Sequence, residues 1–275
     1  MALNPIKPFC YETYHYKTEE FAHWLINYVE TNKIHGLTGW IAWFTNFGWG
    51  KCLNGGPAWE RGVVNRARYH DKLKSVLNNS DNHLISVVNE IIVDWHGMGK
   101  DSSYPLKFAP GIRKALHLLR NEIENSAWIP KQIDDLDTGG TIASMSKIYQ
   151  MIDPHKWTIY DSRVATGLAC LVRRFWSGCG EENDSDLIRF CVPSRKIPGW
   201  KKPVGFPSCS GSRQGCLGFI YASWLLRQVA EIMRSDSKYG IPPTVEIQNT
   251  IQQLDGNWQV YHLEMALWML GDKEF

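Results

Sequence analysis

The chain has 275 residues, of which 21% are charged and 12% aromatic, including 13 tryptophans. This composition excludes intrinsic disorder for the chain as a whole, and no apolar run reaches the roughly 20 residues that a membrane-spanning helix needs. A formal net charge of +2 excludes a broad attraction to nucleic acid, so any DNA-binding charge must be local. We expect a soluble protein of residues 1–275 that folds as one compact helical unit or as two interleaved lobes.

The first predicted helix is amphipathic, because Phe21, Trp24, Leu25 and Tyr28 recur with helical spacing behind Thr18. The same spacing of apolar residues predicts further helices at 84–95, 112–123, 141–152, 163–176, 218–234 and 257–270. No convincing strand pattern appears, and the expected fold class is mostly α. Two stretches interrupt the helices, namely an aromatic and glycine-rich run at 35–59 and a loop-rich, basic insertion at 177–217.

The cysteines predict a reducing compartment. There are seven of them, an odd number, and no C-x-x-C pair occurs, which does not favour a disulfide framework. The first ten residues lack the apolar core of an export signal. We therefore expect a cytoplasmic protein with reduced thiols. A metal site is the alternative for four of the cysteines, namely Cys179, Cys191, Cys209 and Cys216. They lack the close pair of ligands that a usual zinc site contains, so we expect neither a metal nor a cofactor.

The most informative segment spans residues 130–168. A short helix leads through Leu136-Asp137-Thr138-Gly139-Gly140 into a second helix that begins at Thr141. Backbone N–H groups at such a glycine hairpin can bind a phosphate oxygen. After the second helix, Ile159-Tyr160-Asp161-Ser162-Arg163-Val164 places an aspartate at the mouth of the next one.

This arrangement resembles the helix-hairpin-helix DNA glycosylases, in which the hairpin has the sequence Leu-Pro-Gly-Val-Gly and the later element has the sequence Val-Asp-x-His-Val. The spacing from the hairpin to Asp161 matches without a gap when Gly140 takes the place of the last hairpin glycine, and the whole match covers about 40 residues. The sequence departs from the family at Asp137, Thr138 and Arg163, which replace Pro, Gly and His. It also resembles distantly related bacterial proteins with an Ile-x-Asp-Ser-Arg-Val element, and some glycosylases of this kind act in defence against phages with modified bases.

The resemblance implies a two-lobed helical glycosylase fold and a monomeric enzyme that hydrolyses the N-glycosidic bond of a flipped base in double-stranded DNA. Asp161 is the expected catalytic carboxylate, which stabilises positive charge on the sugar and orients or deprotonates water. The base is left open between a glucosylated hydroxymethylcytosine, a damaged purine and a mismatched thymine. Contacts to the DNA backbone are expected from the hairpin and the next helix, at Gly139, Gly140, Thr141 and Arg163.

The resemblance further implies an enzyme without lyase activity. Bifunctional members carry a nucleophilic lysine just after the hairpin, where this chain has Ile142. Lys147 lies five residues further on, more than one helical turn away.

Two other groups of residues are candidates for DNA contact. Residues 163–203 hold eight Lys or Arg and four acids, a local charge of +4, and are expected to contact phosphates through Arg195, Lys196, Lys201 and Lys202. A base pocket is expected from the stacking faces of Trp43, Phe44 and Trp49, together with Asp94 and His96. Each group has a structural alternative: an ordinary surface loop for the first and core packing or helix capping for the second.

Two other functions stay open at this point. The chain could be a DNA-binding helix-hairpin-helix module in which Asp161 is only a helix cap, or a helical interaction protein that does not contact DNA.

Overall fold

In the computed structural model the chain is mostly α-helical, as predicted. The structure describes residues 10–48, 58–97, 103–121, 130–179, 188, 190–193, 205–206, 208–209, 211–243 and 257–273. Within these residues there is no β-strand, only two isolated bridges, and no helix long and apolar enough to cross a membrane. The α-helices are α1 (Tyr11–Thr31), α2 (Trp40–Thr45), α3 (Ala58–Val76), α4 (Asp81–Asn89), α5 (Ala109–Arg120), α6 (Pro130–Asp134), α7 (Ile142–Ile152), α8 (Ser162–Cys179), α9 (Ser212–Ser235) and α10 (Val260–Lys273).

Three shorter elements complete the helices of the described residues. The π-helix η1 (Glu90–Trp95) continues α4, the 3-10 helix η3 (Leu106–Phe108) leads into α5, and the 3-10 helix η4 (Ser237–Tyr239) follows α9.

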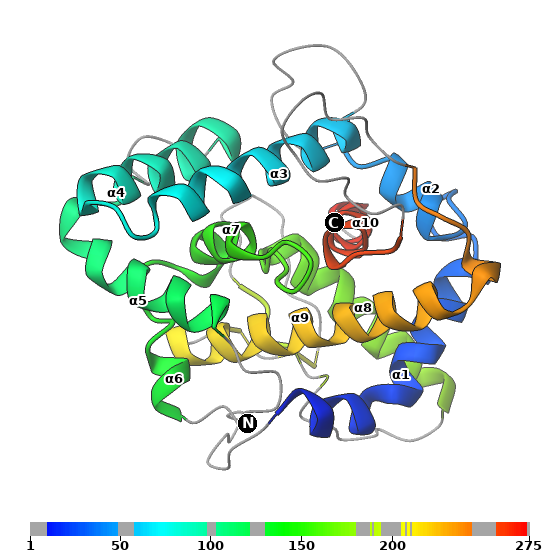
Figure 1. Ribbon diagram of the computed structural model, residues 1–275. Coiled ribbons are helices and arrows are strands. Elements are labelled where there is room, and N and C mark those ends of the chain that lie inside the picture. The colour runs from blue at the N-terminus through cyan, green and yellow to red at the C-terminus, as the bar shows by residue number, and fades with distance from the viewer. Residues whose placement is uncertain are drawn as a thin grey trace.

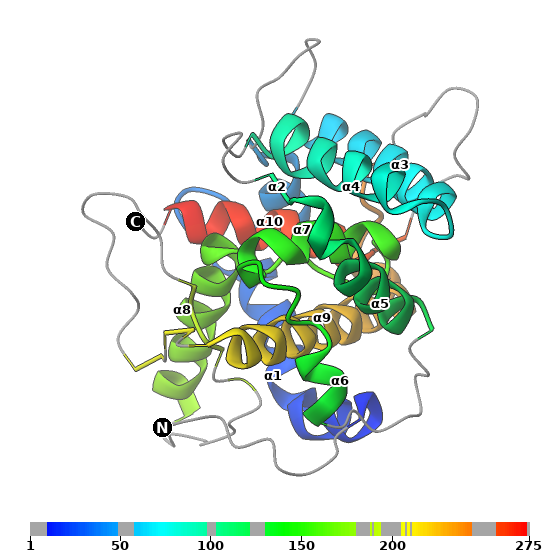
Figure 2. The same ribbon diagram turned by 90° about the vertical axis from the view of Figure 1, so that its left-hand side faces the viewer.

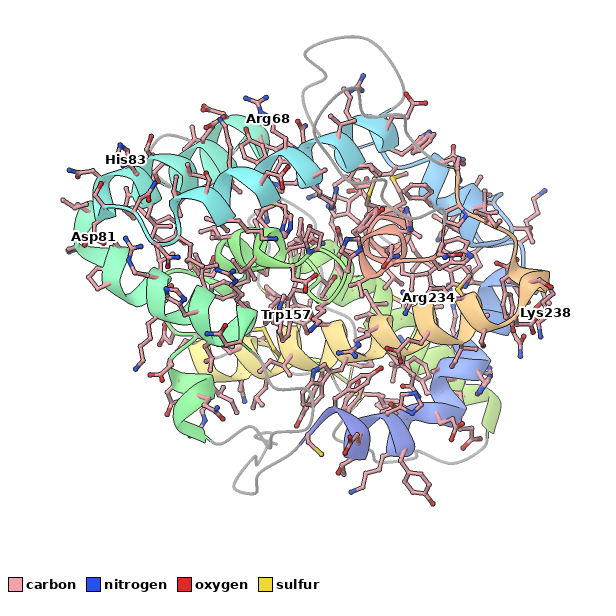
Figure 3. All side chains as sticks on the ribbon, viewed as in Figure 1. Arg68, Asp81, His83, Trp157, Arg234 and Lys238 are labelled. Atoms are coloured by element: carbon pink, nitrogen blue, oxygen red, sulfur yellow. A yellow bond between two sulfur atoms is a disulfide. The ribbon has the colours of Figure 1, made fainter. Side chains whose placement is uncertain are left out.

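The helices form two groups with α7 between them (Figures 1 and 2). Helices α3, α4 and α5 lie on one side of α7, and α9 packs against its other side. Helix α10 packs against α2, α8 and α9, and α1 packs on α9, so the first and last of the described helices belong to one group. Trp157, which follows α7, is fully buried and stacks on Phe219 of α9, whereas Arg68, Asp81, His83 and Lys238 lie at the rim (Figure 3).

Helices α8 and α10 are packed unusually closely because glycines lie at their crossing. A Cβ atom on Gly167 would come within 2.6 Å of the Leu267 carbonyl oxygen, and one on Gly271 would collide with the Arg163 carbonyl oxygen. This close approach fixes the first turn of α8 against the end of α10. The residue that opens α8 is Asp161, so the crossing also positions the carboxylate that the sequence singles out.

The helices predicted from periodicity are confirmed, but the prediction for residues 35–59 is wrong in part. Trp40, Trp43 and Phe44 lie on the short helix α2. Trp59 lies in the first turn of α3, a helix that was not predicted from the sequence. The face that α3 buries includes Gly62 and Arg66, and these residues break the apolar period that would have revealed it. The insertion is also shorter than predicted, since α8 extends to Cys179 and α9 begins at Ser212.

The expectation of reduced thiols is wrong for two cysteines. Cys191 and Cys209 form a disulfide with a Cα–Cα distance of 5.1 Å. The two segments that carry these cysteines are also joined by a backbone hydrogen bond, in which the Cys209 N–H donates to the Val192 carbonyl at 3.3 Å. The disulfide removes two of the four cysteines considered as metal ligands.

Candidate active site

The glycine hairpin forms between α6 and α7 and is covered by aromatic side chains. Gly139 has a φ of +84°, in the left-handed region that favours glycine. A Cβ atom there would come within 2.6 Å of Phe108, and one on Gly140 would collide with the Tyr104 hydroxyl. Thr141 caps α7 by accepting the Ser144 N–H at 3.3 Å. The predicted hairpin therefore exists as a tight turn held against η3.

Carboxylates surround this hairpin. The Gly139 N–H donates to Asp137 Oδ1 at 3.3 Å, so a side chain of the protein occupies one of the donors expected to bind phosphate. Asp135 pairs with Lys114 at 2.7 Å, and Asp134 pairs with Arg213 at 3.5 Å. Asp137 thus brings negative charge to the predicted backbone-binding site.

Asp161 opens α8 and is only 6% exposed. Its Oδ1 accepts the backbone N–H groups of Arg163 at 2.9 Å and Val164 at 3.1 Å. These bonds and the positive end of the helix dipole stabilise a negative charge. The preceding residue, Tyr160, is anchored as well, since its N–H donates to Ser146 Oγ of α7 at 2.9 Å and its hydroxyl donates to the Cys191 carbonyl.

Lys147 is buried as well, although it lies five residues beyond Ile142. It is 5% exposed on α7, and its Nζ donates to the Ala143 carbonyl at 2.6 Å. Burial lowers the pKa of Lys147, while the negative charges of Asp161 and Glu264 oppose that shift.

A network of fully buried polar side chains joins α3, α7 and α10. Arg66 Nη2 of α3 pairs with Glu264 Oε2 of α10 at 2.6 Å. Gln150 of α7 bridges the two: its Oε1 accepts Arg66 Nε at 2.9 Å and its Nε2 donates to Glu264 Oε2 at 3.0 Å. Glu264 Oε1 accepts no hydrogen bond from any described residue. Burial raises the pKa of Glu264, and Arg66 opposes the shift.

The sequence did not lead to a prediction of Arg66, Gln150 or Glu264 as site residues. One signal was available, since Glu264 is the single acid among the apolar residues 260–270 that predict α10. A lone carboxylate on an otherwise apolar helix requires a buried partner. Its partner Arg66 lies 198 residues away, and no local pattern indicates that contact.

The predicted pocket residues are not brought together. Trp43 and Phe44 are 1% and 0% exposed in the core, where Phe44 contacts Trp59 and His262 with ring centroids 5.1 Å and 4.8 Å apart. A base could stack on them only after the core opened. Trp49 lies outside the described residues.

His96 and Asp94 lie in different environments, one buried and one exposed. His96 is buried beside Lys147 and Arg66, and burial together with these two charges lowers its pKa well below the ordinary histidine value. Asp94 is exposed and lines an open surface depression with Ser86 and Asn89. Of the two, only His96 belongs to the buried region around Lys147.

Of the basic residues predicted to contact DNA, only Arg163 belongs to the part of the chain that the structure describes. The Arg163 side chain turns toward α10, where Nε pairs with Asp272 at 2.7 Å and the guanidinium lies 4.4 Å from the centre of the Trp268 ring. Arg195, Lys196, Lys201 and Lys202 lie outside the described residues. Arg163 therefore supports the α8–α10 crossing in this arrangement.

Comparisons with protein-family models, with curated proteins and with solved structures return no match to this chain.

Proposed function

We propose that this protein is a monofunctional DNA glycosylase, which hydrolyses the N-glycosidic bond of a modified or damaged base and leaves an abasic site. The observation that carries the proposal is the burial and hydrogen bonding of Asp161. Asp161 is a buried carboxylate at the start of α8, held by two backbone N–H groups. It stands at the position where the resemblance to the helix-hairpin-helix glycosylases requires the essential aspartate.

Asp161 has the chemistry that such a reaction needs. Cleavage of the bond between C1′ and the base builds positive charge on the sugar, and a fixed negative charge lowers the energy of that state. Because Oδ1 is bound by Arg163 and Val164 N–H groups, Oδ2 is the oxygen available to accept a proton from water. The water oxygen then bonds to C1′, the C1′–N bond breaks, and the base leaves with the bonding electrons.

The absence of lyase activity rests on Ile142. This side chain follows the hairpin, is 7% exposed, and packs against Gly215 of α9. Lys147 donates to the Ala143 carbonyl and is buried, so it does not present a free amine at the surface. Borohydride reduction of the protein in the presence of abasic duplex DNA should give no covalent adduct.

The proposed partner is double-stranded DNA, and the wider setting is defence against phages with modified bases. Support comes from the hairpin, from the +4 charge of residues 163–203, and from the resemblance of Ile159–Val164 to bacterial proteins distantly related to the glycosylases, since some glycosylases of this broad kind act in defence. The carboxylates around the hairpin predict weak binding to unmodified DNA, because they repel phosphates.

A second candidate function is DNA binding without chemistry. It is favoured by the bonds of Asp161 Oδ1, which are those of an ordinary helix cap, and by the packing of Trp43 and Phe44 in the core. In that case the buried charges would only stabilise the fold.

The proposal is tested by incubating the protein with a panel of duplex DNAs. The panel contains glucosylated 5-hydroxymethylcytosine, an oxidised purine, a G·T mismatch, or no modification. We expect mass spectrometry to detect one released base, and we expect strand breaks at its position only after alkali treatment. Binding of the duplexes without release of any base would favour the second candidate.

A further inference from the structure

The Cys191–Cys209 disulfide lies beside the candidate site and has no part in the proposed reaction. The Tyr160 hydroxyl donates to the Cys191 carbonyl, and Tyr160 directly precedes Asp161 in the chain. One hydrogen bond therefore connects the disulfide to the segment that opens α8.

The two cysteines differ in their access to solvent. Cys191 is 0% exposed, whereas Cys209 is partly exposed and follows the exposed Ser208. Exchange of a disulfide begins when an external thiolate attacks one of its sulfur atoms, so the attacked cysteine must be accessible. The geometry therefore directs a reductant to Cys209 and makes Cys191 the leaving group.

Reduction turns Cys191 into a buried thiol, and the structure holds an acceptor for it. Cys191 Sγ lies 3.2 Å from the Gln214 carbonyl oxygen in the first turn of α9. A sulfur in a disulfide has no proton to donate, so this contact becomes a hydrogen bond only when Cys191 is a thiol. Cys191 is consequently stabilised in both oxidation states, and the Tyr160 hydroxyl keeps its acceptor in both.

The segment that carries Cys209 depends more strongly on the disulfide. Its non-covalent contacts include the hydrogen bond from the Cys209 N–H to the Val192 carbonyl, at 3.3 Å, and the stacking of Phe206 on Trp176 of α8, with centroids 5.7 Å apart. The disulfide joins positions that are 18 residues apart, and so it removes loop-closure entropy that otherwise opposes these contacts. After reduction, the non-covalent contacts must hold the segment against that entropy.

Cys216 is the next cysteine along α9, and it does not replace Cys209 as the partner of Cys191. It is 2% exposed, and burial raises the pKa of its thiol to about 12, an effect to which the charges of Asp137 and Asp134 add. Cys216 therefore stays protonated at neutral pH, and a protonated thiol does not attack a disulfide.

We propose that the Cys191–Cys209 disulfide is a redox-sensitive switch. A dithiol reductant opens it, and the segment that carries Phe206 and Cys209 then separates from Cys191, while Cys191 and Tyr160 stay in place. The inference goes beyond the proposed function and does not depend on it. The redox state alters the protein next to the candidate site and leaves the hydrogen bonds of Asp161 unchanged.

The reaction transfers two electrons from the dithiol to the protein. A thiolate of the dithiol attacks Cys209 Sγ, a mixed disulfide forms, and Cys191 leaves as a thiolate that takes up a proton. The second thiolate of the dithiol then attacks the dithiol's own sulfur in the mixed disulfide, so Cys209 leaves and is protonated in turn. The dithiol becomes a cyclic disulfide, and the two protons that it loses are those that the protein gains.

The first test uses the whole chain with dithiothreitol as the reductant. Cysteines are alkylated under native conditions before and after reduction, and the labelled positions are identified by mass spectrometry. We expect Cys191 and Cys209 to be unlabelled before reduction and Cys209 to be labelled after it, with the near-ultraviolet circular dichroism of a folded protein in both states.

Three results would overturn the inference. Labelling of both cysteines after treatment with oxidised glutathione would mean that the disulfide does not form. Resistance to dithiothreitol until a denaturant is added would make the disulfide a fixed structural bond. Loss of the near-ultraviolet signal on reduction would mean that the reduced protein has no folded state.

Amide hydrogen exchange shows what the disulfide holds. The Cys209 amide donates to Val192, and the Tyr160 amide donates to Ser146 Oγ at 2.9 Å. We expect reduction to accelerate exchange at Cys209 by about 10²-fold, the loop-closure contribution of a disulfide of this span, and to leave exchange at Tyr160 unchanged. Equal exchange at Cys209 in both states would contradict the proposal, as would an acceleration at Tyr160.

Cys209→Ser provides a permanently open form. Serine is close to cysteine in size and the position is partly exposed, so the fold should persist. We expect the amide of residue 209 to exchange as fast as in the reduced wild type and not to respond to dithiothreitol. Cys170→Ser, which changes another partly exposed cysteine, on α8, is the matched control and should keep the full redox response. If Cys209→Ser exchanges like the oxidised wild type, or if Cys170→Ser loses the response, the switch does not reside in this disulfide.

Discussion

His262 provides a quantitative test of the buried polar core. It lies in the first turn of α10, is 3% exposed, and its Nδ1 accepts the Gln259 N–H at 3.1 Å. Phe44 and Tyr261 pack against the ring at 4.8 Å and 4.2 Å between centroids. A proton on Nδ1 would face another donor, and burial together with the charges of His155 and Arg66 lowers the pKa of His262 to about 3.

The lowered pKa predicts a loss of stability in acid. The unfolded chain takes up a proton at His262 near its ordinary value of about 6.5, whereas the folded chain does not until about 3. Stability is therefore lost as the pH falls below the unfolded value. Between about pH 7 and about pH 5 this one residue should reduce the free energy of unfolding by about 2 kcal/mol.

The assay is urea unfolding of the wild type and of His262→Asn, followed by tryptophan fluorescence. The asparagine Oδ1 replaces the Nδ1 acceptor and does not titrate. His70 and His96, whose pKa values burial also lowers, contribute equally to both proteins and cancel in the difference. We expect the stability advantage of the wild type to shrink by about 2 kcal/mol over that pH range. A constant difference would show that folded His262 accepts a proton, which would refute the reasoning.

Two further predictions concern the hairpin and the helix crossing. Gly271→Ala should lower the free energy of unfolding by about 1–3 kcal/mol or more in a urea titration, because its Cβ would collide with the Arg163 carbonyl. Gly178→Ala, on α8 with no atom near the added Cβ, should not destabilise, and equal losses at both positions would contradict the packing argument. Asp137→Asn keeps the acceptor for the Gly139 N–H but removes a charge, so it should tighten duplex DNA binding by about 2–5-fold at low salt. Unchanged affinity would mean that the hairpin does not face DNA.

The sequence predicts those parts of the fold in which local pattern and burial agree. Helix α5 buries Ile112, Ala115, Leu116 and Leu119 at helical spacing, and the prediction was correct there. Helix α3 buries Gly62 and Arg66 on the face that should be apolar, and it was missed. The difference is physical, because a buried arginine is tolerated only through its partners Gln150 and Glu264.

The candidate site, like the fold, could be predicted from the sequence only where the signals are local. The hairpin and Asp161 were placed correctly at the starts of α7 and α8, since capping residues and glycines leave local signals. The proximity of Lys147, Arg66 and Glu264 depends on the packing of α3, α7 and α10, which no local pattern encodes. The aromatic run also shows this limit, because an aromatic cluster is compatible with both a base pocket and a core, and Trp43 and Phe44 lie in the core.

The central claim is that Asp161 carries chemistry and is not only a helix cap. The most direct measurement is single-turnover base release by Asp161→Asn from the duplex that the wild type processes, together with its DNA affinity. A matched control is Asp236→Asn, which changes another capping aspartate, one that accepts the Lys238 N–H at 3.1 Å at the rim of the fold. We predict that Asp161→Asn loses base release by about 10³-fold or more while it still binds DNA, and that Asp236→Asn behaves as the wild type. Base release at the wild-type rate by Asp161→Asn would contradict the account.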